Sequence, residues 1–392
     1  MTALFHPHWT DILGIVTLAI WLHLFFGRGS FWRVKKLDAD NDRIDLPDVW
    51  PKIVAIIPAR NEAETIGKVV ASLVNQDYPG ALSIVVVDDH SDDATAAIAR
   101  RVSMEHGADE KVRVVTASAL PAGWTGKLWA LHEAVVSTAA EVPAFFWFTD
   151  ADIAHSPDTL RRLVARAAHN KLDLASLMVL LQAKTQPERA LIPAFLYFFL
   201  MLYPPQWIVD EDLSTAGAAG GCILLRREAL ERIGGFAAIR GEVIDDCALA
   251  HTVKQSGGRV WMGLTQKSVS LRIYGTWSEI LDLIARTAFT QLRYSTLFLA
   301  GTLAGMFLTY LAPVMLLFAH DSTARLLGLL AWLLMTLSFL PTVRFYRLSP
   351  AWALLLPLTA TFYSYATWLS AVRYWMGKGG VWKGRAQAPK ST

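Results

Sequence analysis

Two carboxylates follow a strongly apolar run near the middle of the chain. The run Phe145-Phe146-Trp147-Phe148-Thr149 leads directly into Asp150-Ala151-Asp152. Such a run predicts a buried strand, and open α/β sheets bind ligands at the carboxyl ends of their parallel strands. Two acids this close repel each other unless a cation lies between them, and hard divalent cations prefer carboxylate oxygens. The pattern therefore indicates a metal site at Asp150 and Asp152, with a solvated acidic turn before a helix as the simpler alternative.

A second pair of acids, Asp245 and Asp246, lies at the expected start of a helix. Acids in this place often only compensate the helix dipole, and taken alone the pair favours that explanation. The chemical alternative is general base catalysis, in which a carboxylate accepts the proton of an attacking hydroxyl. Both explanations remain open at this point.

Two other segments have residue types that suit a bound anion. From Ala216 to Gly221 no side chain is larger than a methyl group, so the backbone can approach a ligand closely. Lys127 ends the glycine-containing stretch Gly123-Trp124-Thr125-Gly126-Lys127 and could supply a positive charge. An ordinary solvated lysine at a helix start is the alternative for Lys127.

Strands and helices are expected to alternate around these residues. The first strand begins at Ile53 and ends at Pro58; the other expected strands are 82–87, 112–115, 145–148, 174–182 and 223–225, and the expected helices are 64–76, 94–102, 158–169 and 226–233. Such alternation predicts an α/β fold with parallel strands and right-handed crossovers. No glycine-rich dinucleotide fingerprint follows the first strand, which argues against a nicotinamide or flavin Rossmann domain.

The composition indicates a membrane protein. Of the 392 residues 53% are hydrophobic, and 15 are Trp. The segment from Trp9 to Phe26 is just long enough to span a bilayer, and its basic flank follows it, which predicts an anchor over residues 1–30 with the next segment in the cytoplasm. The net charge of +3, without a basic strip interleaved with aromatic residues, argues against nucleic acid as a partner.

The apolar character returns after residue 295. Segments 297–318, 326–340 and 352–369 are spans or near-spans, so two or three spans are expected over 296–375, before a basic tail over 376–392. Basic residues in the second connector and in the tail both favour the cytoplasm, which an odd number of spans forbids, so the count stays open. The segment 191–203 is apolar but too short to span, and is expected to be an interfacial or buried helix. Residues 31–50 are expected to be a linker, and 51–295 the catalytic domain.

Four short motifs, in this order, resemble those of the membrane-bound inverting glycosyltransferases of family 2. These are Pro58-Ala59-Arg60-Asn61-Glu62, Val87-Asp88-Asp89-His90-Ser91, the DxD motif Asp150-Ala151-Asp152, and Asp245-Asp246. The resemblance covers residues 51–294 and implies a GT-A domain, which is the Rossmann-like fold of nucleotide-diphospho-sugar transferases, with transmembrane helices at both ends.

Longer strings resemble one group within that family, the hopene-associated glycosyltransferases of bacterial hopanoid loci. They begin at Gly123, Ile244 and Trp382 and run to Ala130, Ala250 and Gln387. Two positions depart from the family pattern. Thr290-Gln291-Leu292-Arg293-Tyr294 stands where a Gln/Arg-x-x-Arg-Trp motif is usual, and Asp245-Asp246 replaces the usual Glu-Asp pair.

The resemblance implies a role for each motif residue. A UDP-sugar donor would be held by the following residues: Pro58, Ala59, Arg60, Glu62, Asp89, Lys127, Asp150, Gly220, Gly221 and Arg293. A divalent cation, Mg²⁺ or Mn²⁺, would bind through Asp152, with Asp150 assisting or contacting the ribose. Asp246 would be the general base, and Asp245 would orient it or raise its pKa by like-charge repulsion.

The acceptor implied by the resemblance is a hydroxyl group of a membrane lipid, and a hopanoid in particular. The same resemblance implies a multi-pass protein of the bacterial inner membrane, with its catalytic domain facing the cytoplasm. A non-catalytic GT-A-like scaffold in a lipid-synthesis complex is the main alternative, and its mark would be the loss of the acidic residues, which are all present here. A transporter would need charged residues inside its spans, and 297–318 contains none.

Overall fold

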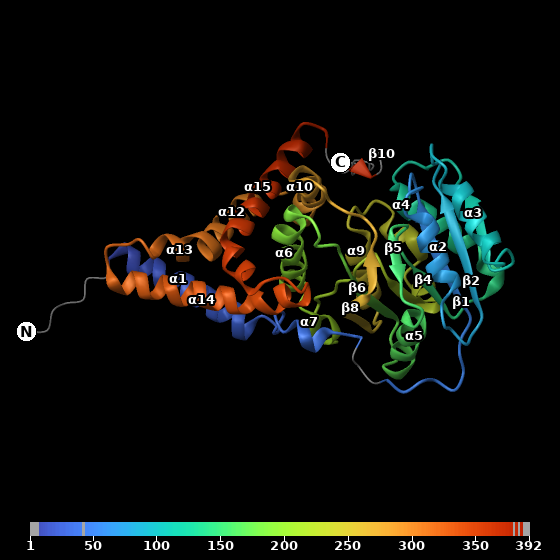
Figure 1. The fold of residues 1–392 in the computed structure, drawn as a ribbon, viewed down its shortest axis with the longest axis horizontal. Helices are drawn as coiled ribbons and strands as arrows, with labels where there is room; N and C mark the ends of the chain where they lie inside the picture. Colours follow the sequence, from blue (N-terminus) through green and yellow to red (C-terminus); the bar gives the residue numbers. More distant parts are fainter. Residues whose placement is uncertain (1–7, 41–43, 379–380, 383–384, 387–392) are drawn as a thin grey trace, which may run out of the picture. The chain divides into compact units, whose positions relative to one another are not determined.

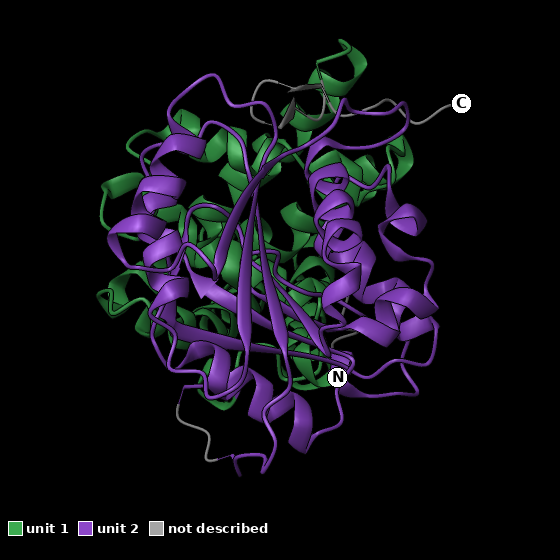
Figure 2. Ribbon diagram, turned by 90° about the vertical axis from the view of Figure 1, so that its right-hand side faces the viewer, with its two compact units in different colours: residues 1–36, 183–206, 274–379 green, residues 37–182, 207–273, 380–392 purple. Residues whose placement is uncertain are grey.

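The computed structural model describes residues 8–40, 44–378, 381–382 and 385–386. Most of the predicted basic tail, with Lys383, Gly384 and Gln387 of the last motif, lies outside the described residues. The chain forms two compact units, which Figure 2 shows in different colours. We call residues 37–182 and 207–273 the sheet unit, and residues 1–36, 183–206 and 274–379 the helical unit. Segment 183–206 belongs to the helical unit although it lies inside the predicted domain 51–295.

The sheet unit is built on an eight-stranded sheet with the order β3-β2-β1-β4-β7-β6-β8-β5, and Figure 1 labels most of these strands. The strands are β1 Ile53–Ala59, β2 Leu82–Asp88, β3 Val112–Thr116, β4 Phe145–Phe148, β5 Ile153–His155, β6 Leu174–Leu180, β7 Ile223–Arg226 and β8 Val260–Ser270. All seven residues of β1 are buried, as are all four of β4. The apolar runs identified from the sequence therefore form the centre of the core, as expected for strands that are covered on both faces.

Strand direction departs from the predicted parallel pairing at β7 and β5, whereas β6 and β8 pair in parallel. Strands β1 to β4 pair in parallel, as predicted. Strand β7, however, is antiparallel to both β4 and β6, and β5 is antiparallel to β8. The prediction of parallel pairing throughout was wrong because the helix between β6 and β7 belongs to the helical unit. That helix does not serve as a crossover, so β7 is not bound to run parallel to β6.

Strands β5 and β8 were missed by the sequence analysis. Strand β5 has only three residues and comes directly after Asp152, which is too short for a periodic signal. Strand β8 has eleven residues, and its central stretch Thr265-Gln266-Lys267-Ser268 is polar. The two strands pair with Ile153 opposite Ser270 and His155 opposite Ser268. Strand β8 therefore pairs with the strand that directly follows the turn containing Asp150 and Asp152.

Helices cover both sides of the sheet within the sheet unit (Figure 2). They are α2 Ile66–Val74, α3 Thr95–Glu105, α4 Gly126–Ser137, α5 Thr159–His169, α8 Arg227–Arg232 and α9 Asp245–Gln255, with short 3-10 helices at Ala139–Glu141 and Gly235–Ile239. Helix α2 buries Ile66, Val69, Val70 and Leu73, at the spacing of one helix face. Burying each such side chain contributes about 1.5–3 kcal/mol, so this one face fixes α2 on the sheet.

The predicted linker begins by pairing with the sheet. Asp38 forms a parallel bridge with Leu264, and Asp40 accepts hydrogen bonds from Thr265 Oγ1 and from the Gln266 backbone N–H, each at 2.7 Å. Residues 41–43 of this segment lie outside the described residues. The chain between the anchor and β1 is therefore held on β8 at residues 38–40.

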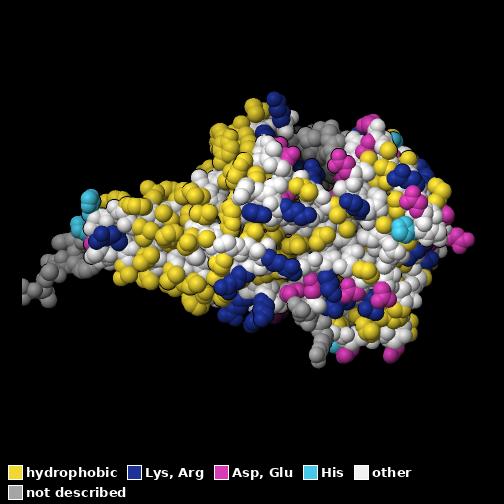
Figure 3. All heavy atoms as spheres, viewed as in Figure 1, with side chains coloured by type: hydrophobic (Ala, Val, Ile, Leu, Met, Phe, Trp, Pro, Cys, Tyr) yellow, Lys and Arg dark blue, Asp and Glu magenta, His cyan; other side chains and the backbone are white. Residues whose placement is uncertain are grey.

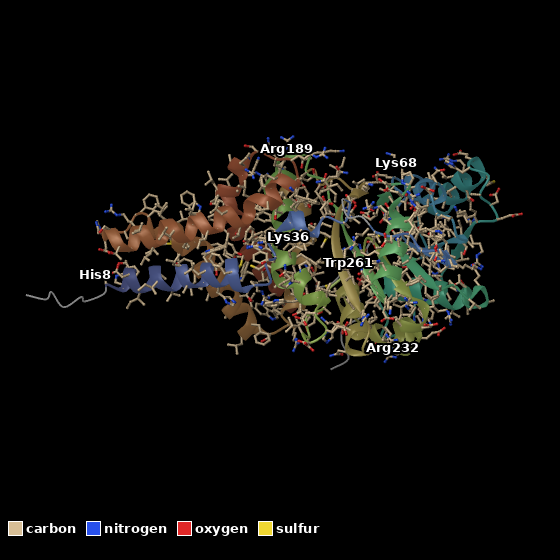
Figure 4. All side chains as sticks on the ribbon, turned by 90° about the horizontal axis from the view of Figure 1, so that it is seen from below. His8, Lys36, Lys68, Arg189, Arg232 and Trp261 are labelled. Carbon is tan, nitrogen blue, oxygen red and sulfur yellow. The ribbon has the colours of Figure 1, made fainter. Side chains whose placement is uncertain are left out.

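The helical unit contains α1 Trp9–Leu22, α6 Gln186–Leu202, α10 Trp277–Ala285, α11 Ala288–Gln291, α12 Thr296–Met306, α13 Ala312–Leu316, α14 Ser322–Phe345 and α15 Leu356–Trp375. Among the described residues, four helical stretches are long and apolar enough to cross a membrane: Trp9–Gly27, Gln186–Val209, Thr296–Leu316 and Ser322–Phe345. Hydrophobic side chains cover the visible face of α1, α13 and α14 (Figure 3). His8 lies at the start of α1 and Lys36 lies beyond its end (Figure 4).

Two membrane predictions need correction. The segment 191–203 was expected to be too short to span, but α6 begins at Gln186, because Thr185 and Glu188 form a capping box there. The α6 stretch is consequently among the four candidate spans. By contrast, the helix in the region of 352–369 runs from Leu356 to Trp375 and is not among them. Its hydroxyl-bearing residues, such as Thr361 and Ser364, lower its hydropathy.

Candidate active site

The ends of three neighbouring parallel strands bring the first group of predicted site residues together. Ala59 at the end of β1 is opposite Asp88 of β2, and Ile56 of β1 is opposite Phe148, the last residue of β4. Carboxyl ends of parallel strands share one edge of the sheet. The Pro58–Glu62 segment, Asp89 and Asp150 therefore all leave the sheet at the same edge.

A cleft with an empty volume of about 330 Å³ opens at this edge. Its lining includes six of the predicted site residues: Pro58, Lys127, Asp150, Gly220, Asp245 and Asp246. Pro58 lies in β1, Lys127 in α4, and Asp245 and Asp246 in α9, while Asp150 follows β4 and Gly220 precedes β7. The structure therefore joins the acid that follows β4 to the acid pair that opens α9, which are 95 residues apart or more in the chain.

Lys127 connects the two acidic groups. Its ammonium lies 2.9 Å from Asp150 Oδ1 and 3.1 Å from Asp245 Oδ2, and its side chain is only 18% exposed. Burial alone would lower the pKa of Lys127, but the charges of Asp150 and Asp245 outweigh it and raise the pKa above its usual value. Lys127 therefore remains a cation, and it is positioned by the start of α4, where Thr125 Oγ1 accepts a hydrogen bond from the Leu128 N–H.

Asp246 has the environment of a general base. Its Oδ2 accepts a hydrogen bond from the Gly220 N–H at 2.8 Å, and its Oδ1 accepts one from the Cys247 N–H at 2.7 Å. Burial raises the pKa of Asp246 to about 6, and the charge of Asp245 adds to the shift. A base with a pKa close to the working pH combines a useful fraction of the ionised form with a strong tendency to take a proton.

Gly220 allows the cleft to close around Lys127 and Asp246. A Cβ atom at this position would lie 3.2 Å from Lys127 Nζ and 3.4 Å from Asp246 Oδ2. The preceding residue is held in place on both sides, because Ser176 Oγ donates to the Ala219 carbonyl and accepts from the Ala219 N–H. Gly220 thus leaves room for these two side chains, and the close approach of a ligand to the 216–221 backbone stays a prediction.

Gly220→Ala is expected to lower the rate of the enzyme by about 10-fold, because the added methyl group displaces the Lys127 ammonium by a few tenths of an ångström. Gly241→Ala is the matched control, since a Cβ there meets nothing closer than the Gly123 carbonyl at 3.6 Å. Steady-state rates of both purified variants test the prediction. Equal rates for Gly220→Ala and Gly241→Ala would contradict it.

The Asp150–Asp152 turn has its two carboxylates in different surroundings. Asp150 is 35% exposed and pairs with Lys127. Asp152 Oδ2 accepts a hydrogen bond from Ser270 Oγ at 3.4 Å, and Asp152 is not among the residues that line the cleft. The turn itself is held by β8, because the Leu271 N–H donates to the Asp152 carbonyl at 2.7 Å.

The donor set at this turn fits a hard divalent cation that also binds phosphate. No group of three or more His, Cys, Asp or Glu side chains that could hold a metal occurs in the part of the chain that the structure describes. Mg²⁺ is typically held by one or two carboxylates, with waters and substrate phosphates completing its coordination. Asp150 and Asp152 could thus hold such an ion together with a diphosphate, but they do not form a complete site by themselves.

The loops after β1 and β2 are tied to each other. Arg60 donates to the carbonyl oxygens of Asp89 and His90, and the Glu62 N–H donates to Thr95 Oγ1 at 2.8 Å. The Asp89 N–H donates to the Ala59 carbonyl at 2.8 Å, and Asp89 is fully buried. These contacts place Arg60, Glu62 and Asp89 in one loop pair next to Pro58, which lines the cleft.

The remaining predicted residues are not part of the cleft lining: Ala59, Arg60, Glu62, Asp89, Asp152, Gly221 and Arg293. Gly221 is buried behind it, where an added Cβ would lie 3.0 Å from Val179. Arg293 belongs to the helical unit, where it is exposed. Its role in donor binding stays a prediction.

Three residues that flank or support the Asp150–Asp152 turn were not predicted from the sequence. Thr149, His155 and Ser268 form a buried hydrogen-bonded group, with His155 between the two hydroxyls. The available signal was weak. It consists of single polar residues next to apolar ones in 145–155, and of a polar stretch in 260–270 that conceals a strand.

Comparisons with known proteins identify the family and the fold. Residues 51–279 match the family described as "Glycosyltransferase like family 2". The chain is 35% identical over 116 residues to a "Beta-monoglucosyldiacylglycerol synthase" of Synechocystis sp., covering 29% of this chain and 22% of that protein. It is 32% identical over 195 residues to the protein of the same name from Trichormus variabilis, covering 47% of this chain and 38% of that one. The matches therefore span well under half the length of these relatives.

One solved structure resembles nearly the whole chain. It is described as "Mannosyltransferase PcManGT from Pyrobaculum calidifontis in complex with GDP-Man and Mn2+", with a TM-score of 0.56 and 22% sequence identity. The similarity covers 94% of this chain and 99% of that one. At this level of identity the likeness concerns the fold.

Proposed function

The chain belongs to the glycosyltransferases of family 2, and from this premise we propose that it transfers a sugar from a nucleotide sugar to a hydroxyl group of a membrane lipid. The observation that carries the proposal is the cleft in which Lys127 lies between Asp150 and Asp245, with Asp246 beside them. A diphosphate leaving group needs positive charge, and an attacking hydroxyl needs a base. Both groups line the same cleft.

The donor end of the cleft is proposed to bind a nucleotide diphosphate sugar such as a UDP-sugar. Arg60, Glu62 and Asp89 in the tied loops would hold the nucleoside, and Lys127 would neutralise part of the diphosphate charge. Asp150 and Asp152 would hold Mg²⁺ or Mn²⁺ against the phosphates. When bound, the ion stabilises the negative charge that develops on the leaving diphosphate.

The acceptor end is proposed to act by direct displacement. The Asp246 carboxylate takes the proton of the acceptor hydroxyl while the acceptor oxygen attacks the anomeric carbon. The bond from that carbon to the nucleoside diphosphate breaks as the new bond forms, so the configuration at the carbon inverts. The Gly220 and Cys247 N–H groups hold the Asp246 carboxylate in position for this step. Direct displacement needs one base and no enzyme nucleophile.

A lipid acceptor is supported by the four long apolar helical stretches and by the two relatives, which are named beta-monoglucosyldiacylglycerol synthases. We propose a hopanoid as the lipid, because the strings that begin at Gly123 and Ile244 resemble the hopene-associated members of the family. We also propose that the protein resides in the bacterial inner membrane with the sheet unit in the cytoplasm. The basic residues after α1, Arg33, Lys35 and Lys36, support this orientation.

The test uses the full-length protein in detergent or nanodiscs. Purified enzyme is incubated with UDP- and GDP-sugars in turn, with hopanoid polyols, diacylglycerol or no lipid added, and both nucleotide release and glycolipid are measured. Release that depends on a lipid acceptor and yields glycolipid supports the proposal. Absence of glycolipid with every donor and acceptor, from a protein that still binds nucleotide sugar, would favour the non-catalytic scaffold instead.

A further inference from the structure

A buried chain of hydrogen bonds lies beneath the Asp150–Asp152 turn. His155 Nε2 is 2.8 Å from Thr149 Oγ1, and His155 Nδ1 is 2.8 Å from Ser268 Oγ. Thr149 Oγ1 lies 3.1 Å from the Gly221 carbonyl oxygen and donates to it. Thr149, His155 and Ser268 are each at most 5% exposed. The chain thus runs from β8, through the histidine ring, to the residue that immediately precedes Asp150.

The directions of these hydrogen bonds follow from proton counting. The single hydroxyl proton of Thr149 is used on the Gly221 carbonyl, so Thr149 Oγ1 must accept from the ring. His155 Nε2 then carries the ring proton, and the bare Nδ1 accepts from the hydroxyl of Ser268. In the opposite tautomer, with the proton on Nδ1, Thr149 would donate its hydroxyl proton to Nε2, and the Gly221 carbonyl would lose this hydrogen bond. The neutral ring with hydrogen on Nε2 is the arrangement that uses every proton.

The surroundings of the ring favour the neutral form. The ring packs against Trp147 with a centroid distance of 4.7 Å, and burial lowers the pKa of His155 to about 3. Burial therefore favours the uncharged ring.

The hydrogen-bonded chain joins the cleft lining to two segments next to it. Thr149 lines the cleft, Gly221 follows Gly220 in the segment next to Asp246, and β8 also holds Asp152 through Ser270. An apolar side chain at residue 155 would fill the same core without the desolvation cost of a buried imidazole. A polar network in this position is justified if it fixes an orientation that apolar packing leaves loose.

We propose that His155 is a positioning residue, which holds the Asp150–Asp152 turn at a fixed distance from the Gly220–Gly221 segment through its Nε2–H bond to Thr149. This inference rests on the proposed function, since the position of the turn matters for the rate only if the turn binds the donor diphosphate and its metal.

Two substitutions distinguish the hydrogen bond of Nε2 from that of Nδ1. In glutamine the amide nitrogen reaches about as far as Nε2, so His155→Gln keeps the donor to Thr149 and loses the acceptor for Ser268. In asparagine the amide reaches only the place of Nδ1, so His155→Asn keeps the contact with Ser268 and loses the donor to Thr149. We expect His155→Asn to lower kcat about 10-fold and to raise the metal concentration at half-maximal rate by a similar factor. His155→Gln should stay within about 3-fold of the unchanged enzyme in both quantities.

The acceptor KM provides the internal comparison. A turn that is merely displaced changes the response to donor and metal, so the acceptor KM should stay the same in both variants. His169→Gln and His169→Asn, at an exposed position on α5, are the matched controls. Equal losses in His155→Gln and His155→Asn, or a greater loss in His155→Gln, would overturn the proposal, because a purely structural role of the ring does not distinguish donor from acceptor.

Nitrogen-15 NMR of histidine-labelled protein in bilayers tests the tautomer without any turnover. The signals that disappear in His155→Gln are expected to be those of a neutral ring with the proton on Nε2, unchanged between pH 5 and pH 8. A proton on Nδ1, or a ring that titrates in this range, contradicts the inference. Because this measurement does not require a substrate, it stays decisive if every nucleotide sugar fails and the proposed function is wrong.

Discussion

Asp246→Asn is expected to reduce glycosyl transfer by about 10²–10⁴-fold, the largest effect of any single substitution in the cleft. Asparagine keeps the size of the side chain, and its single carbonyl oxygen can accept from either the Gly220 N–H or the Cys247 N–H, so one of the two backbone hydrogen bonds is lost. Also lost is the ability to take a proton from the acceptor hydroxyl. Product formation under single-turnover conditions measures this loss, and donor binding, followed by fluorescence or calorimetry, should remain within about 3-fold.

The pH dependence gives an independent check on the same residue. Because burial and Asp245 raise the pKa of Asp246 to about 6, the rate should fall as the pH drops below about 6, where the base becomes protonated. Asp245→Asn removes the like charge and frees Lys127 to favour the ionised form of Asp246, so the acid limb should move to lower pH. Lys127→Met removes a positive charge that lowers the pKa of Asp246, so the limb should move to higher pH.

The control for this series is Asp109→Asn, at an exposed position in the sheet unit. It should leave both the rate and the acid limb unchanged. A rate in Asp246→Asn within 10-fold of the unchanged enzyme, or limbs that do not move in opposite directions in Asp245→Asn and Lys127→Met, would show that another group is the base.

Loss of either carboxylate of the Asp150–Asp152 turn is expected to have the second-largest effect. Asp150→Asn and Asp152→Asn should each lower transfer at saturating donor by at least about 100-fold, because the leaving diphosphate then loses its countercharge. The unchanged enzyme should lose activity on treatment with a chelator and regain it with Mn²⁺ or Mg²⁺. Steady-state rates over a range of metal concentrations measure both effects.

The two variants should differ from each other in one respect. Asp150 pairs with Lys127 and Asp152 does not, so only Asp150→Asn should also change the acid limb that reports on Asp246. Asp48→Asn, at an exposed position, serves as the control for both. If the chelated enzyme keeps its full rate, or if Asp152→Asn responds normally to metal, Asp152 is not a metal ligand.

Strand ends were the part of the site that could be predicted from the sequence. The apolar run before Asp150 has a composition that only a buried strand tolerates, and it forms β4, the fourth strand of a GT-A fold that is confirmed. The same holds for α9, which starts at Asp245 as expected. In both cases a local pattern decides the element, and for Asp150 the general rule on strand ends then places the acid at the binding edge of the sheet.

Contacts between distant residues could not be predicted in the same way. The double ion pair of Lys127 depends on how α4 and α9 meet, and no periodicity in either segment encodes this. Strand β7 was predicted, but its antiparallel direction was not, because the helix that precedes it looks like an ordinary crossover. The length of α6 was underestimated because its first turn, Gln186 to Arg189, is polar and is stabilised by capping.

The way the two units share the chain has a consequence for biosynthesis and for truncation. The polypeptide passes from one unit to the other after residues 36, 182, 206 and 273, so the ribosome must deliver α6 before it delivers β7 and β8. Until then β4 and β6 have bare edges, which are prone to aggregate. A fragment ending before α6, which lacks β7 and β8, should therefore precipitate when it is expressed alone.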